Sequence, residues 1–316
     1  MGQLQVLEGA AKSPLERSVD DYLASVRAGG KAIRTREHYA SVLLRIFLPW
    51  ARREGLTEPA KVDQPALDRF TTELLERGGA KGGPLSPVSV HTYARTVNFY
   101  MSWARSGGEV GQAKAQLPKL PRRVLETLER AEIRALEDAA PTERDKLIIR
   151  MLADTGVRIS ELLGLRPEDL VEKGRDRFVR VIGKGNKERL VPLPPALYAR
   201  LHRYATKGRP ANTYSDRIFL GLRRRAGGDY HALDVSGAEQ MLRQAAERAG
   251  IAPRKRVYPH LLRHSFITFA LKGGMNPLQL ARIVGHEDLT MINQVYAHLT
   301  ASDAAEALMK LFRDEG

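Results

Sequence analysis

The sequence has no cysteine among its 316 residues, which excludes a disulfide framework, a thiolate metal site and a cysteine nucleophile. It also has no apolar run near the ~18–20 residues that a membrane-spanning helix needs. Its first residues, MGQLQVLEGAAKSPLERS, lack the basic stretch and apolar core of a signal peptide. We therefore expect a cytoplasmic protein.

Acidic residues are outnumbered in this chain. There are 51 Lys and Arg residues against 37 Asp and Glu residues, which gives a formal net charge of +14. An excess of this size favours a polyanionic partner, either nucleic acid or an anionic membrane surface. An arginine-rich composition without such a partner gives the same number, so the motifs must decide between these interpretations.

Helical patterns dominate the first third of the chain. Ser13-Pro14 and Ser86-Pro87 are typical helix starts, with serine as the N-cap and proline at the first helical position. Paired glycines end several of the apolar-periodic stretches. We expect a small helical bundle over residues 1–112, a polar, proline-containing linker over 113–123, and a second domain over 124–316.

The second domain contains the only clear strand signals. Two alternating runs, 177–182 and 189–193, are joined by the glycine-containing turn GKGNKE, a pattern that predicts a β-hairpin. Helical patterns precede and follow it. The expected fold class is mainly α with a small β-hairpin or sheet.

Four segments of the second domain carry the candidate chemistry: TGVRISELLGL (155–165), VIGKGNKERLVPL (181–193), HLLRHSF (260–266) and GHEDLTMINQVYAHL (285–299). Arg158 stands at a helix start, where the helix dipole disfavours a cation, so a functional reason for it is plausible. Glu161, three residues further on, is placed to orient it. His260 and Arg263 are three residues apart and share a helix face.

Each signal also has a simpler interpretation. Tyr296 is one of ten tyrosines, most of which must be packing residues. His260 and His264 have the spacing of a zinc pair, but Leu261 stands where that motif needs a general-base glutamate. GKGNK lacks the spacing of a phosphate-binding Walker loop. It is either an ordinary solvated turn or a flexible turn that delivers Lys184 into a groove.

Taken together and in this order, the four segments resemble the tyrosine recombinases, also called phage-type integrases, and most closely their Xer and integrase branch. In the first domain, TREHYASVLLRIFLPWARREG and SPVSVHTYARTVNFYMSWA are similar to the SAM-like core-binding domain of that family. The resemblance implies a SAM-like DNA-binding domain and an α+β catalytic domain. It also implies catalytic roles for two arginines, a hairpin lysine, two histidines and a nucleophilic tyrosine: Arg158, Arg263, Lys184, His260, His286 and Tyr296.

These residue types suit phosphodiester transfer. Negative charge develops on the non-bridging oxygens, and fixed guanidinium forks stabilise it. Tyr296 would attack the phosphorus, His260 would accept its proton, and Lys184 would protonate the departing 5′-oxygen. The resulting 3′-phosphotyrosine bond conserves the energy of the broken bond. We therefore expect no metal, no ATP and no other cofactor.

The expected partner is double-stranded DNA with a specific recombination site, held largely through phosphate contacts. Candidate contacts in the two domains are Thr35, Arg36, Arg95, Lys187 and Arg189. The C-terminal segment ASDAAEALMKLFRDEG forms an amphipathic pattern. We expect it to dock on a neighbouring protomer in a synaptic tetramer; packing on its own domain is the alternative.

Two other functions remain open at this point. A type IB topoisomerase uses a similar set of Arg, Lys, His and Tyr residues, and a non-catalytic DNA-binding regulator would keep the fold alone. The spacing from His286 to Tyr296 is one residue longer than in the Xer-type pattern and occurs in other integrases. Chromosome dimer resolution, phage integration and movement of another element all fit these motifs.

Overall fold

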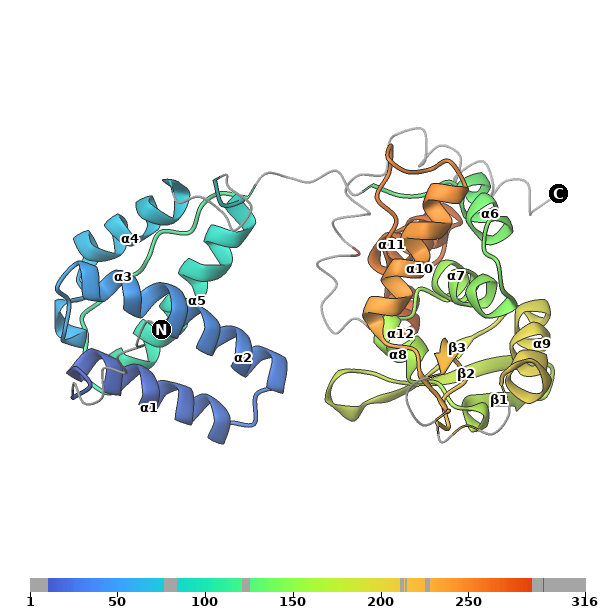
Figure 1. Ribbon diagram of the computed structural model, residues 1–316, viewed down its shortest axis with the longest axis horizontal. Helices are drawn as coiled ribbons and strands as arrows, with labels where there is room; N and C mark the ends of the chain where they lie inside the picture. Colours follow the sequence, from blue (N-terminus) through green and yellow to red (C-terminus); the bar gives the residue numbers. More distant parts are fainter. Residues whose placement is uncertain are drawn as a thin grey trace, which may run out of the picture. The chain divides into compact units, whose positions relative to one another are not determined.

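The structure is a computed structural model, and it describes residues 11–76, 84–120, 126–210, 213, 215–224, 228–285 and 292. The chain divides into two units, Met1–Arg122 and Arg123–Gly316, drawn in blue to cyan and in green to red (Figure 1). Each unit has its own apolar core. Within the described ranges, no helix is both long enough and apolar enough to cross a membrane.

The described part of the first unit is helical throughout its regular elements. Ser13 caps the first helix by accepting a hydrogen bond from the Glu16 backbone N–H, and Ser86 caps the last by accepting one from Ser89. The elements are α1 (Pro14–Ala28), α2 (Ile33–Val42), the π-helical η1 (Leu43–Phe47), α3 (Leu48–Arg53), the 3-10 turn η2 (Pro59–Lys61), α4 (Gln64–Glu76) and α5 (Pro87–Ser106).

Aromatic side chains fill the core of the first unit. The rings of Trp50 and Phe70 lie 4.9 Å apart, and Phe47 lies 6.0 Å from Tyr100. The Tyr100 hydroxyl is satisfied by Ser18 Oγ at 3.0 Å, as a buried phenol requires. These contacts join α1, α3, α4 and α5 around one apolar centre.

The second unit combines helices with two small antiparallel sheets, one ordered β1-β2-β3 and one formed by β4 and β5. The hairpin expected from the alternating runs is β2–β3, with Ile182 opposite Glu188 and Val181 opposite Arg189. The expected fold class, mainly helical with a small sheet, is confirmed. The elements are α6 (Arg130–Asp138), α7 (Glu143–Thr155), α8 (Ile159–Leu163), η3 (Pro167–Asp169), β1 (Leu170–Lys173), β2 (Asp176–Ile182), η4 (Lys184–Asn186), β3 (Glu188–Pro192), α9 (Pro195–Arg203), η5 (Tyr204–Gly208), β4 (Leu220–Arg224), β5 (Tyr230–Ala232), α10 (Val235–Arg248), α11 (Pro259–Lys272) and α12 (Pro277–Val284).

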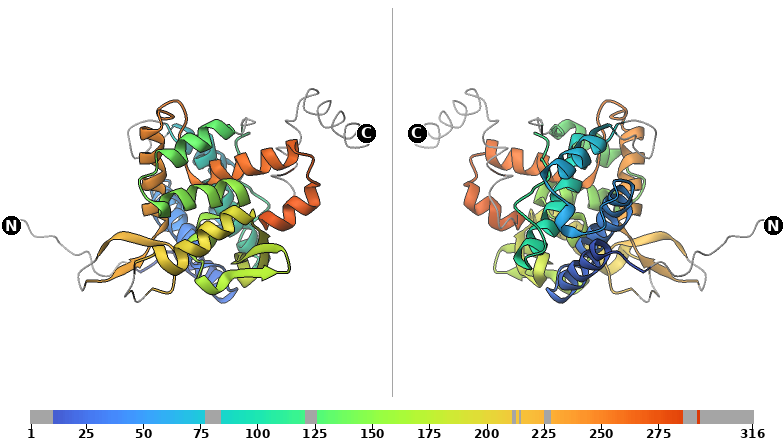
Figure 2. Two further views of the ribbon diagram at one scale, coloured as in Figure 1. Left: turned by 90° about the vertical axis from the view of Figure 1, so that its right-hand side faces the viewer. Right: turned by 90° about the vertical axis from the view of Figure 1, so that its left-hand side faces the viewer.

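Helix α7 is the central element of the second unit, packed against α6, α9 and α11 (Figure 2). Most of its side chains are buried, and its first turn includes the buried ion pair Arg144–Asp145. Arg144 also donates to the carbonyl of Leu220 at 2.6 Å, which ties α7 to β4. Because α7 ends where the candidate site begins, its packing positions one wall of that site.

Candidate active site

The turn from α7 into α8 places Arg158. Helix α7 ends at Gly156, which has a left-handed backbone with φ of 61°. A Cβ atom on Gly156 would lie 2.4 Å from Cδ1 of Phe266, so both the backbone angle and the close approach of α11 require glycine here. The chain then passes buried Val157 and reaches Arg158, the N-cap of α8.

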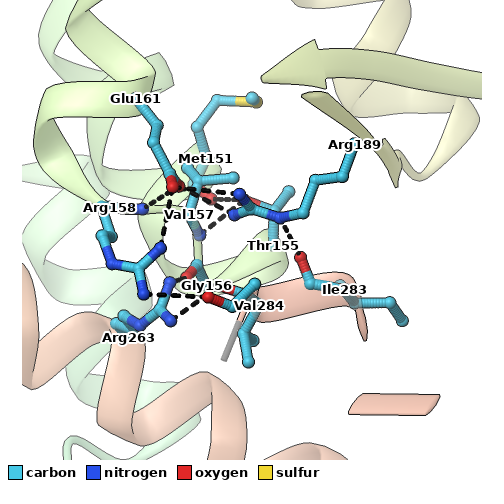
Figure 3. A network of polar contacts seen from close by, with 11 residues as sticks. Met151, Thr155, Gly156, Val157, Arg158, Glu161, Arg189, Arg263, Ile283 and Val284 are labelled. Atoms are coloured by element: carbon cyan, nitrogen blue, oxygen red, sulfur yellow. Dashed lines mark hydrogen bonds and ion pairs between the residues drawn. The ribbon is translucent and has the colours of Figure 1, made fainter. Parts of the chain in front are cut away.

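A buried carboxylate, Glu161, holds two arginines (Figure 3). Its Oε2 accepts from the backbone N–H of Arg158 at 2.9 Å, and its Oε1 accepts from Arg158 Nη1 at 2.9 Å. Arg189 of β3 grips both oxygens, with Nη1 at 3.0 Å from Oε1 and Nη2 at 2.8 Å from Oε2. Burial alone would raise the pKa of Glu161, but the hydrogen bonds from Arg189 and Arg158 outweigh it and lower the pKa.

The C-terminal end of α12 receives three guanidinium groups. Arg189 Nε donates to the carbonyl of Ile283 at 2.8 Å, and Arg158 Nη2 donates to that of Gly285 at 3.0 Å. Arg263 Nη2 donates to the carbonyl of Val284 at 2.7 Å. The last carbonyls of a helix are negative and lack partners within it, so cations satisfy them well.

Arg263 is almost completely buried, with 1% of its surface exposed. Besides Val284, its guanidinium binds the carbonyl of Gly156 at the end of α7. Burial and the nearby charge of Arg158 lower the pKa of Arg263 to about 9, so it still carries its charge at neutral pH. The structure thus brings Arg158, Glu161 and Arg263 into one network, with a net positive charge facing the end of α12.

The two described histidines of the HLLRHSF segment lie close together on α11. His260 lies in the first turn with only part of its surface exposed, and its ring centre is 6.4 Å from that of His264. Partial burial of its ring and the charges of Arg263 and Arg158 lower the pKa of His260, so the imidazole is neutral at neutral pH. Within the ranges that the structure describes, no group of three His, Cys, Asp or Glu side chains is placed to hold a metal.

The turn between β2 and β3 carries the candidate lysines. Lys184 begins the 3-10 turn η4, followed by Gly185 and Asn186 with left-handed φ angles of 75° and 60°. Lys187 is exposed beside the start of β3. The side chain of Lys184, and the whole of His286 and Tyr296, lie outside the described residues.

In the first unit, the candidate DNA contacts lie on α2 and α5. Thr35 and Arg36 are half-buried in the first turn of α2, while Arg95 is exposed on α5 with its guanidinium 5.4 Å from the Phe99 ring centre. The two helices are joined through Thr96 Oγ1 and His38 Nε2 at 3.4 Å. These three candidates therefore belong to packed helices of one unit.

Arg189 is a candidate DNA contact from the sequence, but in the structure its guanidinium is bound within the protein. Only 14% of its side chain is exposed, and its guanidinium is bound to Glu161 and Ile283. Sequence reasoning missed this, although a signal existed: along a strand, residues two apart share a face. Arg189 therefore lies on the same face of β3 as buried Val191, facing the protein interior.

The comparisons with known proteins agree on a single family. The phage integrase family profile matches residues 126–303. The chain is 35% identical over 290 residues to tyrosine recombinase XerD of Mycobacterium tuberculosis, covering 86% of this chain and 89% of the relative. It is 32% identical over 307 residues to tyrosine recombinase XerC of Oceanobacillus iheyensis, covering 94% and 96%.

Solved structures of low sequence identity share the fold. The XerH site-specific recombinase bound to palindromic difH substrate, in a post-cleavage complex, matches with a TM-score of 0.67 and 18% identity over 92% of this chain and 83% of that one. The Tn1549 transposon integrase in complex with transposon right end DNA matches with a TM-score of 0.68 and 20% identity, over 93% and 99%.

The crowding around Gly285 leads to a test of the network's rigidity. Gly285 has φ of 69°, and a Cβ atom there would lie 2.7 Å from Cζ of Arg189. Gly174 has φ of 60°, and a Cβ atom on Gly174 would have nothing within 4 Å. Alanine at either position costs about 1–2 kcal/mol for the left-handed backbone, but Gly285→Ala must also displace Arg189, for about 1–3 kcal/mol more.

We therefore expect Gly285→Ala to lower the thermal unfolding midpoint clearly further than Gly174→Ala does, as measured by circular dichroism. Equal shifts for the two variants would contradict the close packing of Arg189 on Gly285.

Proposed function

Because the chain belongs to the phage integrase family and is a tyrosine recombinase, an enzyme that breaks and rejoins DNA, we propose that it cleaves a strand at a specific recombination site through a 3′-phosphotyrosine bond to Tyr296. The observation that carries this proposal is the meeting of two guanidiniums at the end of α12. Arg263 and Arg158 bind the consecutive carbonyls of Val284 and Gly285, and His286 is the next residue in the chain.

The two arginines supply the charge that phosphoryl transfer needs. Arg158 keeps a third of its side chain exposed, so a phosphate can reach its fork from outside. Arg263 lies behind it, buried and charged at neutral pH. Cations fixed in a poorly solvated site stabilise the developing charge on the non-bridging oxygens without reorganising during the reaction. His286 would add a hydrogen-bond donor to the phosphate-binding site that Arg158 and Arg263 form.

His260 and Lys184 would carry out the proton transfers. The lowered pKa of His260 keeps its imidazole neutral, which is the form that accepts the phenolic proton of Tyr296 as the oxygen attacks phosphorus. The bond from phosphorus to the 5′-oxygen breaks, and Lys184 gives that oxygen its proton. Religation runs the same transfers backwards: a 5′-hydroxyl attacks, Lys184 takes up its proton, and Tyr296 leaves with the proton of His260.

DNA is the partner that supports this chemistry. The XerH recombinase is described as bound to palindromic difH substrate, and the Tn1549 integrase as in complex with transposon right end DNA. In this chain, Thr35, Arg36 and Arg95 would contact the duplex from the first unit and Lys187 from the β2–β3 turn. Phosphate contacts of this kind make affinity depend strongly on salt. We propose that the protein acts in the cytoplasm.

A cavity of about 460 Å³ in the second unit supports docking between protomers. Its apolar lining includes Phe266, Phe269 and Met275, and its charged lining includes Arg130 and the ion pair of Arg150 with Asp154 at 2.6 Å. The C-terminal segment 301–316 carries an apolar stripe with Leu308, Met309, Leu311 and Phe312, and ends in the acidic pair Asp314 and Glu315. Apolar complementarity favours this segment, supplied by a neighbouring protomer, as the occupant in a synaptic tetramer.

The nucleophile is tested with a suicide substrate whose nick lets the cleaved fragment diffuse away. Wild type should accumulate a covalent protein–DNA adduct, visible as a slower band on a denaturing gel, because the 5′-hydroxyl needed for religation is lost. Tyr296→Phe should bind the same DNA with unchanged affinity and form no adduct. An adduct with Tyr296→Phe, or none with wild type, would contradict the proposal.

Docking of the C-terminal segment is tested by mixing two variants and counting protomers on DNA by native gel. Deletion of 301–316 and Phe269→Glu, which puts a charge in the cavity, should each abolish tetramers. Docking between protomers predicts that the mixture regains paired protomers, because intact tails meet intact cavities. Leu278→Glu, at an exposed apolar residue of α12 outside the cavity lining, is the control and should assemble normally. No recovery in the mixture would mean that the segment packs on its own domain.

A further inference from the structure

We propose that Arg189 is a positioning residue for phosphoryl transfer, which sets the aim of Arg158 and the end of α12 without touching DNA. This inference rests on the proposed function, since it takes Arg158 as a phosphate-binding residue. Its basis is the set of contacts around the guanidinium of Arg189 (Figure 3).

The contacts of Arg189 leave little for a phosphate. Each of its three nitrogens donates to a protein oxygen: Nη1 and Nη2 to the two oxygens of Glu161, and Nε to the carbonyl of Ile283. By contrast, Arg180 on the neighbouring strand β2 has 39% of its side chain exposed and pairs with Asp169 at 3.2 Å. Two arginines of the same sheet thus differ in their surroundings: Arg189 faces the interior and Arg180 faces the surface.

Arg189 joins three segments that are far apart in the sequence. It belongs to β3, one arm of the hairpin whose turn includes Lys184. Through Glu161 it is bound to α8, and through Ile283 to the end of α12. Arg158 makes the complementary pair of contacts, to Glu161 and to the carbonyl of Gly285. Both arginines therefore bridge the same carboxylate to the same helix end.

The surrounding backbone is shaped to admit this guanidinium. A Cβ atom on Gly285 would meet Arg189 Cζ at 2.7 Å, and one on Gly183 would lie 3.3 Å from Nη1 and 3.4 Å from Glu161 Oε1. The absence of a side chain at Gly183 and at Gly285 thus lets the backbone approach Arg189 from two sides. A lysine ammonium has no planar fork and cannot bind both carboxylate oxygens in parallel while also reaching Ile283.

The consequence for Arg158 follows from the shared carboxylate. When Arg189 no longer occupies both oxygens of Glu161, the full charge of that buried carboxylate acts on Arg158. The fork of Arg158 is then drawn toward Glu161, away from the phosphate that approaches from its exposed side. A displacement of about 1 Å in a positioning group costs roughly 100-fold in rate.

The test measures single-turnover adduct formation by Arg189→Lys on the suicide substrate at saturating enzyme. We expect the rate to fall about 100-fold, while the DNA affinity and its salt dependence stay unchanged. Arg180→Lys is the matched control and should react at the wild-type rate. A weaker affinity with a salt slope smaller by about one, and a normal rate at saturation, would identify Arg189 as a phosphate contact and overturn the inference.

A second substrate separates Arg158 from Lys184 as the residue that Arg189 serves. Replacing the 5′-bridging oxygen with sulfur gives a leaving group that departs as a thiolate and needs no proton donor. Lys184→Ala should recover on this substrate, whereas Arg189→Lys should stay slow because its defect lies in phosphate binding. Recovery of Arg189→Lys would overturn the proposed link to Arg158.

Failure of the proposed function would be recognised separately, because wild type would then form no adduct or Lys184→Ala would not respond to sulfur. If Arg189 had a purely structural role, the unfolding midpoint of Arg189→Lys would fall together with its rate. Glu161→Gln, measured in the same way, is the control. If Arg189 acts through Glu161, the double variant Glu161→Gln/Arg189→Lys should react no more slowly than the slower single variant. Rate losses that multiply would overturn the inference.

Discussion

The buried charge of Glu161 is the constraint on which the candidate site depends. Only 3% of its side chain is exposed, so its charge has almost no water to stabilise it and must be met by protein donors. Arg158 and Arg189 meet it from α8 and β3, which fixes the spacing between these elements. Removing one partner from a buried group of charges leaves the others uncompensated, which costs about 3–5 kcal/mol.

The carbonyl groups at the ends of α7 and α12 bind the arginines together with the Glu161 carboxylate. One carboxylate cannot balance three guanidiniums, and the remaining charge faces the carbonyls that close α7 and α12. These carbonyls carry the negative end of each helix dipole and lack partners within the helix. They hold the arginines in place without neutralising them. The site therefore keeps an excess of positive charge, as the proposed binding of a phosphate requires.

Much of the fold could be predicted from the sequence because its signals are local. Serine caps at Ser13 and Ser86 and the alternation around GKGNKE each act within a few residues. The family could also be predicted, and the comparisons confirm it. The Arg144–Asp145 pair and the bond from Arg189 to Ile283 could not, because they join segments whose distance is set by tertiary packing. From the sequence Arg189 is a candidate DNA contact, whereas its strand face directs its guanidinium toward the protein interior. The catalytic roles of Arg158, Lys184, His260, Arg263, His286 and Tyr296 stay predictions.

The site depends on Glu161 being ionised and held by two guanidiniums. Carbon-13 NMR of a chain labelled at the glutamate carboxyl carbons measures this directly, with Glu161→Gln to assign the resonance. The pKa of Glu161 lies below its ordinary value of 4.5. Its contribution to stability is therefore present above that pH and is lost as the pH falls through the lowered pKa. We expect its resonance to remain that of a carboxylate at pH 4.5, where exposed glutamates are half protonated. Protonation of Glu161 above pH 4.5 would contradict the account.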